Sequence, residues 1–116
     1  MRDAEADISI YKVYERHCVV LCVEPGKYHL GAHEMRARDG YRTWFGDVEI
    51  KRRYVSAHLM PVCVHPELLA DVSDALRKRM QGKSCFNFSS TDATLSRQLR
   101  LLADAGFRRF RADGRL

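Results

Sequence analysis

The chain has 116 residues, of which 46% are hydrophobic and 30% charged, and its formal net charge is +5. The length fits one domain, residues 1–116, with a single core. The composition excludes a disordered chain, a collagen-like repeat and a membrane protein, since no apolar run approaches the roughly 18 residues that a membrane span needs. The first twenty residues lack the pattern of a secretory signal. We therefore expect a cytoplasmic protein whose four cysteines are reduced thiols.

The first half of the chain predicts one helix and four strands. Acidic residues followed by aromatic residues near helical spacing predict a short helix over Ala4–Arg16. Cys18–Val23 is apolar and β-branched, Tyr28–Glu34 alternates apolar and polar residues, and a Pro-Gly turn joins them. Two more strands are predicted over Thr43–Lys51 and Tyr54–Val64. Together the four strands predict an antiparallel meander.

After the fourth strand the pattern changes to helical spacing. His65-Pro66-Glu67 opens a helix, because proline suits the first helical position. Ser73 is the expected N-cap of a second helical start, and Gly82 is its expected C-cap. Ser84–Phe88 predicts a short strand.

A final helix carries a leucine stripe at helical spacing. Ser90 or Thr91 is its expected N-cap, Asp92 lies in its first turn, and Gly106 is its expected end. Beyond it, Phe107 and Phe110 are expected to pin the tail onto the core. The element order α-β-β-β-β-α-β-α predicts an α+β two-layer sandwich, in which an antiparallel sheet of about five strands carries helices on one face.

Three sequence blocks carry a resemblance to a known family. Trp44–Lys51, Tyr54–Val62 and Lys78–Phe88, in this order, resemble the YdhG-like family, a bacterial group of unknown function. The turn at Glu24–Tyr28 and the closing Ala105–Phe107 fit the same pattern, so the resemblance covers nearly the whole chain. It implies a bacterial protein with a compact α+β fold, similar to secretion-chaperone-like and frataxin-like sandwiches.

One relative in that family is described as a frataxin-like intracellular iron chaperone. For such a role the resemblance implies an acidic ridge on the first helix. The matching acidic residues, which basic residues interrupt, are Asp3, Glu5, Asp7 and Glu15.

Strand alternation places imidazoles and carboxylates on one face of the predicted sheet. The candidate metal ligands, which suit Fe(II) or another divalent metal, are His29, Asp47, Glu49 and His58. His33 shares the strand face of His29, and Ser56 and Met60 share that of His58. Cross-strand neighbours lie about 5 Å apart, so the geometry permits a shared site. The alternative interpretation is an ordinary polar surface facing solvent.

A second candidate group would bind a small ligand through the sheet face or the groove beside it. Its residues are Trp44, His58, Lys83 and Ser84. The Gly-Lys-Ser run that contains the last two resembles the end of a phosphate-binding loop. However, Arg77 stands where that loop needs glycine, and the strand follows the run instead of preceding it, which excludes nucleotide hydrolysis.

We expect a non-enzymatic binding or chaperone-like module for a small ligand, a metal such as iron, or a partner protein. We assign no catalytic residue and no membrane partner, and the chain is expected to be a monomer or a homodimer. One alternative is a metal-assisted enzyme that uses His58, Asp47 and Glu49. Another is nucleic-acid binding through the basic C-terminal tail, although the strand aromatics favour a core over a nucleic-acid surface. The tail arginines are Arg97, Arg100, Arg108, Arg109, Arg111 and Arg115.

Overall fold

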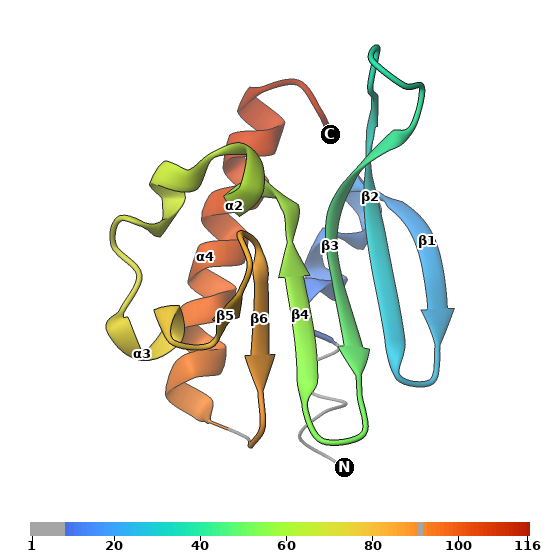
Figure 1. Ribbon diagram of the computed structural model, residues 1–116. Coiled ribbons are helices and arrows are strands. Elements are labelled where there is room, and N and C mark those ends of the chain that lie inside the picture. The colour runs from blue at the N-terminus through green and yellow to red at the C-terminus, as the bar shows by residue number, and fades with distance from the viewer. Residues whose placement is uncertain (1–8, 91) are drawn as a thin grey trace.

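A computed structural model describes residues 9–90 and 92–116 of the chain. Within these residues the fold is α+β, with one antiparallel sheet of six strands in the order β1-β2-β3-β4-β6-β5 (Figure 1). The strands are β1 (Val19–Glu24), β2 (Lys27–Met35), β3 (Arg42–Ile50), β4 (Val55–Leu59), β5 (Met80–Gln81) and β6 (Cys85–Phe88). The helices are η1 (Ser9–His17), α2 (Met60–Val64), η2 (Pro66–Leu69), α3 (Asp74–Arg77) and α4 (Ala93–Ala112). The predicted α+β class and the four-strand meander are confirmed, and β5 is an additional strand.

The core lies between the sheet and the helices η1 and α4, which are behind the sheet in Figure 1. Phe45 of β3 is fully buried at its centre. Its ring centroid lies 5.4 Å from that of Tyr14 in η1, and 6.3 and 6.2 Å from those of Phe107 and Phe110 in α4. The other buried hydrophobic residues of the sheet alternate along their strands and are Tyr28, Leu30, Ala32, Val48, Val55, Ala57, Leu59 and Phe86. No helix in the described ranges is long and apolar enough to cross a membrane.

The first helix has a tighter winding than predicted. Instead of an α-helix over Ala4–Arg16, the chain forms the 3-10 helix η1 over Ser9–His17, and residues 4–8 lie outside the described part. Side chains three residues apart eclipse one another in a 3-10 helix. Tyr11 and Tyr14 have this spacing, and both are buried against the sheet.

The fourth strand ends earlier than predicted. We expected it to run over Tyr54–Val64, but β4 ends at Leu59 and the helix α2 follows at once. Pro61 is the reason, because proline suits the first turn of a helix and cannot donate to a strand ladder. The helix predicted from His65-Pro66-Glu67 is only the four-residue η2.

Ser73 is the N-cap of α3 as predicted, and its hydroxyl accepts from the Leu76 amide at 3.2 Å. The prediction that Gly82 is the C-cap is wrong, because α3 ends at Arg77. Gly82 lies instead in the turn between β5 and β6, where its positive φ of 79° suits glycine.

Helix α4 differs from the prediction at both ends. Its N-cap is Asp92, whose carboxylate accepts from the Leu95 amide at 3.0 Å, instead of Ser90; Thr91 lies outside the described residues. The helix does not end at Gly106 but continues to Ala112. Phe107 and Phe110 are therefore buried as part of the helix, not as part of a returning tail.

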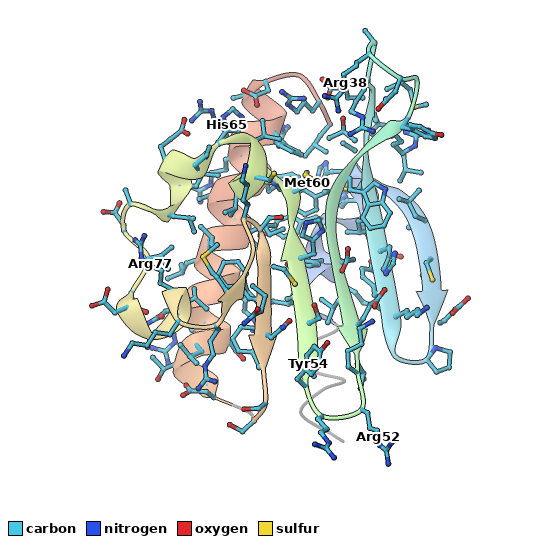
Figure 2. All side chains as sticks on the ribbon, in the orientation of Figure 1. Arg38, Arg52, Tyr54, Met60, His65 and Arg77 are labelled. Carbon is cyan, nitrogen blue, oxygen red and sulfur yellow. The ribbon has the colours of Figure 1, made fainter. Side chains whose placement is uncertain are left out.

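Gly106 lets α4 approach α2 closely. A Cβ atom at this position would lie 2.8 Å from Cβ of Pro61, closer than two such carbons can come. The same end of α4 is fastened by His65, whose Nε2 is 2.5 Å from Oδ2 of Asp113. Figure 2 shows His65 after α2, beside the C-terminal end of α4. The two contacts fix α4 against the strand-to-helix junction after β4.

We predict that Gly106→Ala lowers the free energy of unfolding by about 1–3 kcal/mol, because the added methyl group overpacks against Pro61. Helix propensity alone would raise it by about 1 kcal/mol. Urea unfolding measures the net sign. Ala105→Gly is the control, since Ala105 is the exposed neighbour in the same helix and reports propensity without the Pro61 contact. A Gly106→Ala variant as stable as the original would contradict this packing.

Candidate functional site on the open sheet face

The candidate site lies on the sheet face that points away from η1 and α4. The strand register places His29 opposite Asp47, Asp47 opposite His58, and His58 opposite Cys85. One row of polar side chains therefore crosses β2, β3, β4 and β6. Figure 2 views the sheet from this side, with the tip of the β2–β3 hairpin labelled by Arg38 at the top and the β3–β4 turn labelled by Arg52 at the bottom.

His58 is held at both ring nitrogens. Its Nδ1 lies 3.3 Å from Oδ2 of Asp47, and its Nε2 lies 2.6 Å from Oγ of Ser84. An ionised carboxylate only accepts hydrogen bonds, so Nδ1 carries the proton in the neutral imidazole. The lone pair of Nε2 then faces Ser84, and the serine hydroxyl donates to it. Asp47 and Ser84 are both buried, each with 7% of its surface exposed.

His29 is held by a carboxylate on one side only. Its Nε2 lies 3.0 Å from Oε1 of Glu49, whose other oxygen lies 2.5 Å from Nζ of Lys51. The hydrogen bond from Lys51 lowers the pKa of Glu49 below its ordinary value, and His29 lowers it further. Among the described residues, Nδ1 of His29 has no hydrogen-bond partner. With the proton on Nε2, this nitrogen carries a lone pair that can accept a hydrogen bond.

Trp44 contacts both imidazoles. Its ring centroid lies 5.3 Å from that of His29 and 6.5 Å from that of His58, and 38% of its surface is exposed. The sequence named Trp44 as a candidate ligand-binding residue but did not place the indole between the two histidines.

A β-bulge directs Trp44 to this face. Leu30 pairs with Gly46 and Gly31 pairs with Trp44, so Phe45 is an extra residue in β3. A Cβ atom on Gly46 would lie 3.0 Å from the ring of Tyr11, which explains why glycine follows the buried Phe45. The bulge thus lets Phe45 enter the core while Trp44 stays on the open face.

The four predicted metal ligands share this face but form two separate pairs. His29 is paired with Glu49 and His58 with Asp47. The described part of the chain contains no group of three or more His, Cys, Asp or Glu residues arranged to hold a metal ion.

Among the other expected members of this face, Met60 is the one that lies elsewhere. Met60 begins α2 and packs against the core, so its predicted place beside Ser56 and His58 is wrong. His33 is exposed at the end of β2, where the pairing with β3 is irregular. Ser56 does lie beside this row, and its Oγ is 3.0 Å from Sγ of Cys85.

The predicted ligand-binding group is brought together in part. Trp44 and Ser84 both contact His58. Lys83 is exposed in the β5–β6 turn and forms no ion pair within the described ranges. The hydrogen bond between Ser84 and His58 was not predicted, because we expected Ser84 to begin the strand over Ser84–Phe88, whereas it lies in the turn before β6.

Comparison with known proteins adds no relative. No family model, no curated protein and no solved structure matches the chain.

We predict that Lys51→Ala raises the pKa of Glu49 toward its ordinary value of 4.5, because Lys51 is the main cause of the lowering. Since the pKa of Glu49 is lower in the folded chain, its ionised form stabilises the fold above pH 4.5, and this contribution disappears as the pH falls through the lowered value. Carboxyl carbon NMR during a pH titration measures the shift. Arg52→Ala, which removes an exposed cation from the next position, should leave the pKa of Glu49 unchanged.

Proposed function

We propose that the protein is a binding module whose open sheet face holds an uncharged planar small molecule. The observation that carries this proposal is an exposed indole held between two imidazoles, each fixed by a carboxylate. Indole rings stack on planar groups, and fixed imidazoles lose little rotamer freedom when a ligand binds.

The hydrogen-bonding groups of the face favour a ligand that donates. Nδ1 of His29 presents a lone pair, and the carboxylates of Asp47 and Glu49 accept hydrogen bonds but do not donate. An anionic ligand would meet both carboxylates, while an amide N–H would find an acceptor. An aromatic amide therefore suits this face better than the corresponding carboxylate.

The same face supports a metal less well. Lone-pair nitrogen suits Fe(II) or Zn(II), but each imidazole is paired with its own carboxylate, and the described residues bring no three such ligands together. An iron-chaperone role, the YdhG-like resemblance and the two-layer sandwich classification remain predictions. The acidic ridge expected for iron includes Asp3, Glu5 and Asp7, which lie outside the described residues.

Nucleic-acid binding through the basic tail receives little support from the charges around it. Within the described structure, three of its six arginines are in ion pairs. Arg108 pairs with Asp104, Arg109 with Glu67, and Arg115 with Glu34. Paired guanidinium groups contribute less to phosphate binding than free ones, so the tail offers fewer cations than its composition suggests.

We predict that nicotinamide quenches the fluorescence of Trp44, the only tryptophan in the chain, and that nicotinate at the same concentration quenches it less. The two probes share one ring and differ in one substituent. The amide of nicotinamide donates hydrogen bonds, whereas the carboxylate of nicotinate is repelled by the carboxylates of the face. His29→Leu should weaken nicotinamide binding about three- to tenfold, which corresponds to the roughly 0.5–1.5 kcal/mol of one hydrogen bond.

His33→Leu is the matched control for that experiment. His33 lies on the same strand but is exposed near its end, and the ring contacts of Trp44 among the described residues are with His29 and His58, so this variant should bind like the original. Equal quenching by nicotinamide and nicotinate, or equal binding by the two histidine variants, would contradict the proposed face. Zn(II) or anaerobic Fe(II) in place of nicotinamide tests the metal alternative with the same fluorescence signal.

A further inference from the structure

We infer that Ser84 is a nucleophile activated by His58 and Asp47, and that the open face hydrolyses uncharged aryl esters. This inference deepens the proposed function, on which it rests for the placement of the aryl ring. The bond-making step needs only these three residues, which the fold brings within hydrogen-bond reach of one another.

The three side chains form an ordered hydrogen-bonded chain. Asp47 lies 3.3 Å from Nδ1 of His58 and fixes the tautomer, while Nε2 lies 2.6 Å from the hydroxyl oxygen of Ser84. A serine becomes nucleophilic when its hydroxyl lies within hydrogen-bond reach of a base and a third group orients that base. Here His58 is the base and Asp47 is the orienting group. The carboxylate and the imidazole come from the paired strands β3 and β4, and the serine directly precedes β6.

The arrangement is specific to one of the two serines that share this region. Ser56 also belongs to β4, but its hydroxyl bonds to Sγ of Cys85 instead of to an imidazole. Ser84 therefore has a base that Ser56 lacks. This contrast provides an internal control for any test of reactivity.

The group borders the uncovered side of the sheet through His58, whereas Ser84 itself has 7% of its surface exposed. The side chain of His58 is 24% exposed, and the indole of Trp44 lies against it with 38% of that residue exposed. An aryl ring stacked on Trp44 is brought beside the imidazole that holds Ser84. The carboxylates of Asp47 and Glu49 disfavour anionic esters, so the substrate class is uncharged.

The reaction balances with water as the only co-reactant. Oγ of Ser84 attacks the ester carbonyl carbon while its proton passes to Nε2 of His58. The bond from the acyl carbon to the aryl oxygen breaks, and the aryl oxygen takes the proton from Nε2, which leaves an acyl ester on Ser84. Water then attacks this ester, giving a proton to Nε2, and the acid leaves as the proton returns to Oγ.

The test uses an uncharged aryl fluorophosphonate on the full chain. Attack by Oγ forms a phosphorus–oxygen bond and releases fluoride, so the modified residue is mapped by tandem mass spectrometry. We expect one phosphonate group, on Ser84. His58→Ala should lower the rate of labelling about 100-fold or more, because it removes the general base. Asp47→Asn should lower it more than about tenfold by favouring the wrong tautomer.

Two variants complete the test. Ser56→Ala should be labelled at the original rate, and Ser84→Ala should not be labelled. Should Ser84→Ala fail to fold by circular dichroism, the mapped residue and the Asp47→Asn rate decide the question. The inference is overturned when Ser84 stays unlabelled under conditions that fully modify a known serine hydrolase, or when His58→Ala is labelled as fast as the original.

The two proposals fail in different ways. Quenching of Trp44 by nicotinamide without labelling of Ser84 removes the nucleophile and leaves the binding face. Labelling of Ser84 without quenching removes the stacking site and leaves the nucleophile.

Discussion

The register between β3 and β4 is the constraint on which the open face depends. Asp47 and His58 are directly opposed, and a shift of one residue would turn each of them toward the core. Such a shift would also bring Val48 and Ala57, which are buried against the helices, to the surface. The apolar contacts on one side of the sheet therefore fix the polar geometry on the other side. The site is stabilised by residues that never touch it.

Much of this geometry could be predicted from the sequence, because strand alternation carries it. Alternation correctly assigned His29, Asp47 and His58 to one face, and apolar spacing correctly gave the meander. The failures occur where local chemistry interrupts a regular pattern. Pro61 ended β4 early, and Gly106 proved to be a packing residue and not a helix terminator. Glycine and proline each have several structural uses, and sequence spacing does not distinguish them.

The contact between Ser84 and His58 illustrates a second limit. Ser84 was a candidate ligand-binding residue because of the Gly-Lys-Ser run around it, and that reason does not account for its position. Its hydroxyl reaches the imidazole because Gly82 turns the chain and β6 pairs with β4. The β-bulge that exposes Trp44 is similar, since it depends on an extra residue in β3 that only the pairing reveals. Turns and bulges position both side chains that the regular pattern left undetermined.

The two hydrogen bonds of His58 span very different lengths of chain. Asp47 is 11 residues away across a short turn, whereas Ser84 is 26 residues away, beyond α2, η2 and α3. Closing a longer loop costs more conformational entropy, so the β3–β4 hairpin can form before β6 joins it. This entropy difference favours a folding order in which the imidazole is oriented first and acquires the serine later. In the native protein, local opening of β5 and β6 would separate Ser84 from its base while the Asp47–His58 pair stays intact.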